Sequence, residues 1–320
     1  MRASVFMAML SVVAVACQRK DTALFELLPS SKTHIDFSNT LKSSKLTILD
    51  YMYYYNGGGV AAGDINNDGW VDLYFTASEG SNKLYLNKGN FEFEDITEKA
   101  GVACATDWST GVTMADVNSD GFLDLYVCQV SRFKGLPGHN KLFINNQDLT
   151  FTEQAQAYGL DFAGFSTQSA FFDYDQDGDL DMYLLNHSVH SVRSYGPATL
   201  RNEMDSLSGD RLFRNEFTSG RSYFQDVTHD AGIYSSHIGY GLGVGVSDIN
   251  LDGWPDIYVS NDFHENDYLY INRGDGTFQD SLEQLISHTS RYSMGNDIAD
   301  INGDGWPDIV TMDMLPYQSK

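Results

Sequence analysis

The sequence predicts an all-β protein, a β-propeller of four-stranded blades, with about five blades in this chain and the ring incomplete. Three observations predict this fold. A short segment rich in Asp and Gly recurs five times, small residues precede each copy, and an alternating aromatic segment ending in Asn follows each of the first four copies. Units of about 50 residues that each hold four short strands are typical of propellers.

The composition agrees with this fold class. The 320 residues are 42% hydrophobic and 13% aromatic, and they include 29 Gly, 19 Tyr and 19 Phe. Aromatic residues favour strands, and glycines favour the tight turns between them. The formal net charge is -24. Such a surface repels phosphate backbones, which excludes nucleic acid as an expected partner.

The first residues predict export. Arg2 precedes an apolar run from Ser4 to Ala16, which is too short to span a bilayer and is typical of a signal peptide. Cys17 follows the small residues "AVA" and resembles the cysteine of a bacterial lipobox, which is lipidated. An ordinary signal peptide with an incidental Cys17 is the alternative interpretation.

We therefore expect a lipoprotein signal over residues 1–17 and a linker or first-strand segment over 18–50. The protein would lie at the bacterial cell envelope, at the outer membrane or cell surface, and would touch the membrane only through its lipid anchor. The two remaining cysteines, Cys104 and Cys128, could form a disulfide or remain as buried free thiols.

Residues 51–320 hold the repeats. The segment "DINNDGWVDLYF" begins at Asp64, and its siblings begin at Asp116, Asp173, Asp248 and Asp300. Runs of small residues such as "NGGGVAAGD" precede the copies, and such residues suit an innermost strand, where neighbouring blades crowd towards the axis. Aromatic segments such as "KLYLNKG" and "YLYINRGDG" suit the wider gaps between outer strands.

Two irregularities interrupt this pattern. The interval between the third and fourth copies is longer than the others, and the surplus falls in Asn186–Asp210, which we interpret as an insertion between strands. The fifth unit reaches Lys320 soon after its second strand. We therefore expect a partial propeller, either a fragment or a prematurely ended product, with further blades missing from this chain.

Each repeated segment has the donor pattern of a metal loop. Counted from the first Asp, positions 1, 3, 5 and 9 carry side-chain oxygens, and position 6 is always Gly, which allows a sharp turn. The predicted metal ligands are Asp64, Asn66, Asp68, Asp72, Asp116, Asn118, Asp120, Asp124, Asp173, Asp175, Asp177, Asp181, Asp248, Asn250, Asp252, Asp256, Asp300, Asn302, Asp304 and Asp308.

The donor chemistry predicts Ca²⁺ as the metal. All-oxygen ligands with three or four carboxylates select a hard cation with flexible coordination, Ca²⁺ before Mg²⁺. A helix–loop–helix calcium site would need an acidic residue at position 12, where the first loop has Phe75. The alternative, an Asp/Asn/Gly turn that binds nothing, explains five copies poorly. Neighbouring carboxylates repel by about 4 kcal/mol per pair, so we expect the metal to be structural.

These segments resemble the FG-GAP/VCBS repeats, the calcium-loop blades of integrin α-subunit propellers. The flanking "KLYLNKGNFEFEDITEKAGV" and "DGTFQD" are similar to bacterial secreted relatives of the cartilage acidic protein, ASPIC/UnbV type. The resemblance covers about Tyr51 to Pro316 and implies a calcium-binding propeller. The sequence departs from the pattern at Asp179, which replaces a bulky position-7 residue, and in its incomplete last unit.

The insertion contains one basic and aromatic cluster. His187, His190, Arg193, Tyr195 and Arg201 could form a binding lip for an anionic or sugar ligand, or a surface loop that pairs with nearby carboxylates.

No nucleophile elbow, H-E-x-x-H helix or Walker loop is present in the sequence, and no catalytic residue is assigned. We therefore expect a calcium-binding propeller, more readily a non-enzyme, that binds extracellular protein or glycan at the cell surface. The alternative is an extracellular hydrolase or lyase that acts on polysaccharide.

Overall fold

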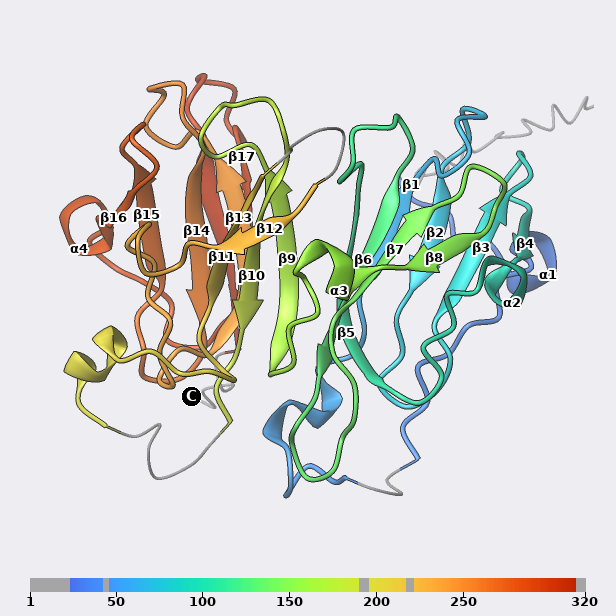
Figure 1. The fold of residues 1–320 in the computed structure, drawn as a ribbon, viewed down its shortest axis with the longest axis horizontal. Helices are drawn as coiled ribbons and strands as arrows, with labels where there is room; N and C mark the ends of the chain where they lie inside the picture. Colours follow the sequence, from blue (N-terminus) through green and yellow to red (C-terminus); the bar gives the residue numbers. More distant parts are fainter. Residues whose placement is uncertain (1–23, 43–45, 190–195, 217–221, 315–320) are drawn as a thin grey trace, which may run out of the picture.

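The computed structural model describes residues 24–42, 46–189, 196–216 and 222–314. Its strands form five antiparallel sheets that follow one another along the chain (Figure 1), here called blades 1 to 5. Blade 1 comprises β1 (Val60–Gly63), β2 (Asp72–Phe75), β3 (Lys83–Asn87) and β4 (Phe93–Asp95). Blade 2 comprises β5 (Trp108–Ala115), β6 (Asp124–Val130), β7 (Lys141–Asn145) and β8 (Phe151–Glu153). Blade 3 comprises β9 (Ser166–Phe172), β10 (Asp181–Asn186), β11 (Arg211–Asn215) and β12 (Phe224–Asp226). Blade 4 comprises β13 (Gly241–Ser247), β14 (Asp256–Asn261), β15 (Tyr268–Asn272) and β16 (Phe278–Asp280), and blade 5 comprises β17 (Ser293–Ala299) and β18 (Asp308–Asp313).

The helices of the described residues are all short. They are α1 (Ser30–Thr33), η1 (Met52–Tyr55), α2 (Thr97–Ala100), α3 (Ala155–Tyr158), η3 (Ala198–Asn202) and α4 (Leu282–Leu285). In the described part of the chain, none of them has the length and apolar character needed to cross a membrane. The all-β prediction and the four-stranded blade are therefore confirmed.

The first strands of successive blades are neighbours, which places them innermost, as the small-residue pattern predicted. At their closest approach they leave no room for side chains. A Cβ on Gly59 would lie 3.0 Å from the Cα of Gly111, and one on Gly243 would lie 2.7 Å from the Cα of Gly295. Glycine is therefore required where the inner strands of adjacent blades meet.

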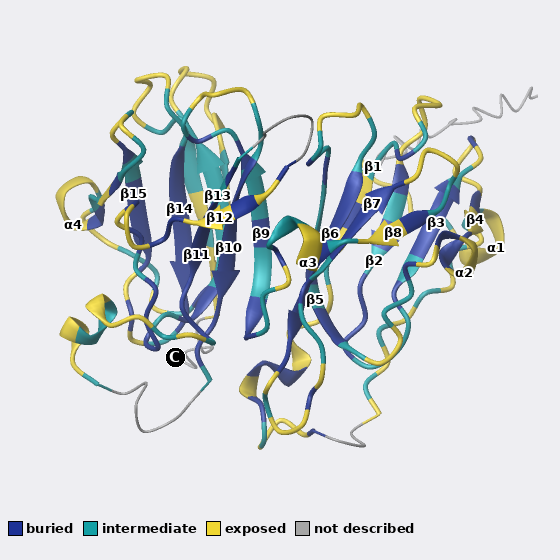
Figure 2. Cartoon of the chain, viewed as in Figure 1, coloured by how far each residue is buried: buried dark blue, intermediate teal, exposed yellow. Residues whose placement is uncertain are grey.

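The hydrophobic core lies between the blades. One cluster joins blades 1 and 2, a second joins blades 2 and 3, and a third joins blades 3 and 4. The second strands β6, β10 and β14 are buried along their whole length, whereas the innermost β13 is only partly buried (Figure 2). Each blade thus buries its faces against its neighbours, which is how propeller sheets are stabilised.

The two edges of the sheets carry different connections. The hairpins between first and second strands, which contain the repeated Asp segments, all lie at one edge, the upper edge in Figure 1. The opposite edge carries η1 and the connection from β10 to β11, which is the segment that the sequence marks as an insertion. The tyrosines of residues 51–54 pack there in one cluster with Trp108 and Tyr240.

A tyrosine and an Asn or Asp tie the second strand of each complete blade to the third. The side-chain pairs are Tyr74–Asn82 at 2.9 Å, Tyr126–Asn140 at 3.1 Å, Tyr183–Asp210 at 2.8 Å and Tyr258–Asp267 at 2.6 Å. The same Asn or Asp accepts a backbone N–H from the end of the second strand, as when Asn186 donates to Asp210 at 2.8 Å. These buried groups therefore satisfy one another.

We predict that Asp210→Asn makes the protein more stable at neutral pH. Burial raises the pKa of Asp210 to about 7, so the folded state holds this proton above the pH at which the unfolded chain releases it. Stability from this group is therefore greatest below the unfolded pKa of about 4 and is lost as the pH rises towards 7. Asparagine, which blades 1 and 2 use at this position, should remove that loss and stabilise by about 1–3 kcal/mol at pH 8.

Urea unfolding of the two proteins at pH 5 and pH 8 would check this. The exposed Asp161→Asn serves as the control, and it should leave the pH dependence as it is. If Asp210→Asn keeps the pH dependence of the parent protein, the buried carboxylate does not have the role assigned to it.

Candidate metal centre

Each repeated loop turns through two backbone positions with positive φ, at positions 4 and 6. In the first loop these are Asn67 at 59° and Gly69 at 87°. The other pairs are Ser119 and Gly121, Gln176 and Gly178, Leu251 and Gly253, and Gly303 and Gly305. Two such residues within three positions reverse the chain and direct the side chains at positions 1, 3 and 5 inward.

Backbone N–H groups fix the carboxylates within the turn. Asp64 Oδ2 accepts the N–H of Gly69 at 2.7 Å, and Asp68 Oδ1 accepts the N–H of Trp70 at 2.8 Å. The same two contacts recur in the other four loops at 2.8–3.2 Å. The carboxylate positions are therefore set by the loop backbone, which is the preorganisation a cation site needs.

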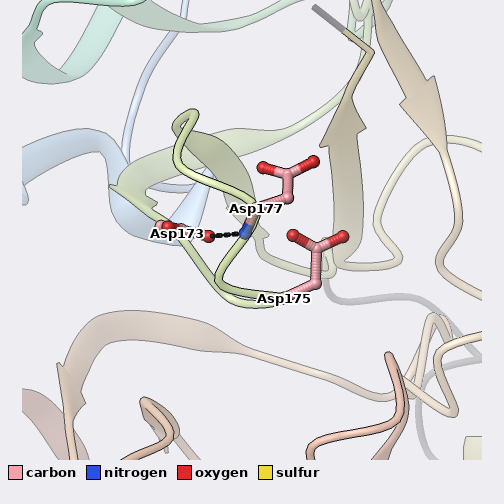
Figure 3. Close-up of side chains that lie close together, drawn as sticks. All are labelled: Asp173, Asp175 and Asp177. Atoms are coloured by element: carbon pink, nitrogen blue, oxygen red, sulfur yellow. Dashed lines mark hydrogen bonds between the residues drawn. The ribbon is translucent and has the colours of Figure 1, made fainter.

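The third loop brings three carboxylates together. Asp173, Asp175 and Asp177 each place an oxygen within 4.8 Å of the others (Figure 3). Asp175 Oδ1 is buried and has no hydrogen-bond partner among the described residues, and burial followed by the charge of Asp177 raises the pKa of Asp175. A cluster of hard oxygens with a buried, unsatisfied acceptor fits a divalent cation such as Ca²⁺.

All four other loops replace the middle carboxylate by the amide of an Asn, and three of them form the same side-chain contact. There Asn at position 3 donates its Nδ2 to Asp at position 5, as Asn66 does to Asp68 at 3.0 Å. Asn118–Asp120 and Asn250–Asp252 form the same contact at 3.1 and 2.9 Å. The amide oxygen remains a metal donor, while the amide nitrogen reduces the repulsion that carboxylates alone would create.

In the first four loops the Asp at position 9 is buried and contacts the sheet as well as the loop. Asp72 is fully buried; its Oδ2 accepts the N–H of Ile65 at 3.0 Å, and its Oδ1 accepts the N–H of Asn87, the last residue of β3, at 2.7 Å. The same pair of bonds forms around Asp124, Asp181 and Asp256. Burial raises the pKa of Asp124 to about 7 and that of Asp181 to about 8. A bound cation would favour the charged form of both.

Adjacent loops and blades are joined by side-chain amides. Asn67 donates to the carbonyl of Gly121 at 2.9 Å, so the first loop contacts the second, and Gln176 donates to Gly253 at 2.6 Å between the third and fourth. Asn145 donates to the carbonyl of Ile65 at 2.8 Å. At the loop edge, side-chain amides therefore join blade 1 to blade 2 and blade 3 to blade 4.

The structure separates the two described residues of the predicted lip. His187 is 1% exposed, and its ring nitrogens lie 2.6 Å from Tyr51 Oη and 3.1 Å from Thr167 Oγ1. Arg201 Nε lies 3.0 Å from Glu265 Oε1, an ion pair between the β10–β11 connection and blade 4. His190, Arg193 and Tyr195 lie outside the described residues, as does Cys17. Cys104 and Cys128 are free thiols, the second fully buried.

Several residues that build the loops were not predicted. The position-4 residues carry the positive φ, and the Asn that ends each third strand binds the closing carboxylate. The repeated Asn in "KLYLN", "KLFIN", "RLFRN" and "YLYIN" was visible in the sequence but gave no indication of its partner. Two of the position-7 tryptophans pack over glycines, since a Cβ on Gly89 would lie 3.3 Å from Trp70, and one on Gly274 would lie 2.8 Å from Trp254.

Comparison with known families agrees with this architecture. A family described as "FG-GAP-like repeat" matches residues 64–127 and 248–311, which include the first, second, fourth and fifth loops. The chain carries FG-GAP-like repeats. It is 26% identical over 240 residues to cartilage acidic protein 1 of Xenopus tropicalis and 24% identical over 244 residues to the human protein.

The match to each of these relatives covers 74% of this chain and 33% of the relative, so the chain spans about one third of their length. Among solved structures, an Agrocybe aegerita lectin described as recognising non-reducing terminal N-acetylglucosamine superposes with a TM-score of 0.42 and 18% identity, over 79% of this chain and 59% of the lectin.

We predict that Leu251→Asn stabilises the protein by about 0.5–1 kcal/mol. Leu251 has a φ of 61°, a left-handed conformation that branched side chains adopt at a cost and Asn adopts readily. Leu251→Ala is the matched control, because it removes the same half-exposed side chain and keeps the strained backbone. Thermal unfolding of the three proteins gives the comparison, and equal gains from Asn and Ala would contradict the role assigned to the backbone.

Proposed function

We propose that this chain is the propeller of an exported, lipid-anchored binding protein in which Ca²⁺ occupies the five repeated loops and stabilises the blades. The observation that carries the proposal is the convergence of carboxylates in these loops, seen most fully in Asp173, Asp175 and Asp177. Five Ca²⁺ would also reduce the formal net charge from -24 to about -14.

The contacts of the loops support a structural role for the metal. The donors at positions 1, 3 and 5 lie in the turn. The Asp at position 9 follows this turn, begins the second strand and accepts an N–H from the end of the third strand, as Asp72 does. The first loop is also hydrogen-bonded to blade 2, and the third loop to the fourth. A cation that stabilises the turn would therefore also stabilise the pairing of the second and third strands and the contact with the adjacent blade.

A binding role for the propeller, with an extracellular protein or glycan as partner, is favoured over hydrolysis by the surroundings of the lip residues. His187 is buried against Tyr51 and Thr167, and Arg201 is engaged by Glu265. Both side chains thus have partners that explain their positions without a reacting substrate. Loops at a propeller edge are the usual place for macromolecular contacts on such scaffolds.

We predict that removal of Ca²⁺ with EDTA lowers the thermal midpoint and that added Ca²⁺ restores it. At 1 mM Ca²⁺ and a dissociation constant of about 0.1 mM, each site adds about 1.4 kcal/mol, so five independent sites add about 7 kcal/mol. Differential scanning calorimetry in EDTA, Ca²⁺ and Mg²⁺ is the measurement. An unchanged midpoint in EDTA would contradict the structural role.

Replacement of single predicted ligands should show how much each loop contributes to the Ca²⁺-dependent increase in thermal midpoint. Asp177→Asn removes one of the three converging carboxylates and should reduce both the Ca²⁺-dependent increase in midpoint and the number of ions bound per chain by one. The exposed Asp230→Asn should change neither.

The same proteins tested on extracellular protein and glycan arrays should lose binding in EDTA without turnover of the bound partner, and turnover would instead support the hydrolase interpretation.

A further inference from the structure

A cavity of about 790 Å³ opens on the propeller axis at the edge opposite the metal loops. Its wall is formed by the starts of the innermost strands of blades 2 to 5, by the glycines that precede β1, and by residues 51–53, 55 and 56. Its volume is in the range that accommodates a small organic molecule. None of the functions assigned above to the loops uses this space.

The ends of the second strands bring chemically different residues to this cavity. Counted six positions after the closing Asp, successive blades carry Ser78, Val130, His187, Asp262 and Met314. Of these, His187, Asp262 and Met314 line the cavity. The repeat thus delivers one residue per blade to the same edge, and only blade 4 delivers a carboxylate.

Asp262 is a buried carboxylate without a compensating partner. It is 2% exposed, and in the described part of the chain its side chain accepts a single hydrogen bond, from the N–H of Phe263 at 2.8 Å, and forms no ion pair. Burying an unpaired charge is costly, and such a group persists where it serves binding.

The other buried acids of the described residues have such partners. Outside the metal loops, Asp210 and Asp267 each accept a tyrosine O–H, and Glu265 is paired with Arg201. The closing aspartates accept two backbone N–H groups each, as shown for Asp72. Asp262 therefore differs from every other buried acid in this part of the molecule.

The rest of the wall favours a cation with an apolar body. No Lys or Arg is among the described residues that line the cavity, whereas Tyr53, Tyr55, Trp108 and Phe263 contribute aromatic rings. Aromatic faces attract ammonium groups, and a buried carboxylate adds the counter-charge that such a group needs. Neither feature favours an anion or a phosphate ester.

We propose that the axial cavity is a binding site for a small organic ammonium ion, with Asp262 as its counter-charge and the aromatic wall as its apolar contact. The site is separate from the metal loops, so it does not depend on the proposed function. Its ligand would neutralise a buried acid that the described residues leave without a compensating partner.

Calorimetric titration with choline, in saturating Ca²⁺ so that the loops are filled, tests the proposal. Choline should bind with saturable heat, and the neutral alcohol in which carbon replaces its ammonium nitrogen should bind at least about tenfold more weakly, a difference of about 1.4 kcal/mol. This comparison needs no variant. Saturable binding of a neutral sugar in place of choline, or equal binding of choline and the alcohol, would overturn the proposal, as would no binding of choline at millimolar concentration.

Two variants test whether the carboxylate of Asp262 is the counter-charge of the bound ammonium ion. Asp262→Asn keeps the acceptor for the N–H of Phe263 and removes the buried charge, so it should fold with a midpoint at least as high as that of the parent and bind choline at least about tenfold more weakly. Asp297→Asn removes the same charge from an exposed position on β17 outside the cavity wall and should bind choline like the parent. Unchanged choline affinity in Asp262→Asn would show that this carboxylate is not the counter-charge.

Discussion

The buried carboxylate that closes each of the first four loops is the interaction on which the rest of its blade depends. Asp72, Asp124, Asp181 and Asp256 are at most 1% exposed, and each accepts one N–H from the start of its loop and one from the end of the third strand. The turn, the second strand and the third strand are therefore held by one side chain. Loss of either oxygen would leave a buried N–H unsatisfied, which costs about 1–3 kcal/mol.

This arrangement lets the two edges of the sheets differ in chemistry. At the loop edge, the donors are repeated with little variation because each loop must make the same turn. At the opposite edge, the residue that follows the second strand is free to vary, and Val130, His187 and Asp262 occupy equivalent positions. Glycines such as Gly111 and Gly243 bring the inner strands close enough for His187 and Asp262 to line one axial cavity.

Local patterns in the sequence were sufficient to predict the blades and the loops, because donors, turn glycine and strand lie within twelve residues of one another. The surroundings of the β10–β11 segment could not be predicted in this way. The sequence analysis placed His187 and Arg201 in one binding lip. In the structure, His187 forms a β-bridge with Tyr240 and lies at the axis, whereas Arg201 forms an ion pair with Glu265 of blade 4. Contacts between blades depend on the position of each segment around the propeller axis, and that position cannot be predicted from the spacing of residues in the sequence.

The positions of the tryptophans give the molecule two separate optical reporters. Three of the four, Trp70, Trp254 and Trp306, occupy the same position in three of the repeated loops, and Trp70 and Trp306 are 50% and 56% exposed. Trp108 is 3% exposed and lies in the wall of the axial cavity. Emission at long wavelength therefore originates mainly at the loop edge, and emission at short wavelength originates at the axis. Were a lanthanide bound in the loops, the first group would sensitise it, and the occupancy of the two edges could then be followed separately in one unlabelled sample.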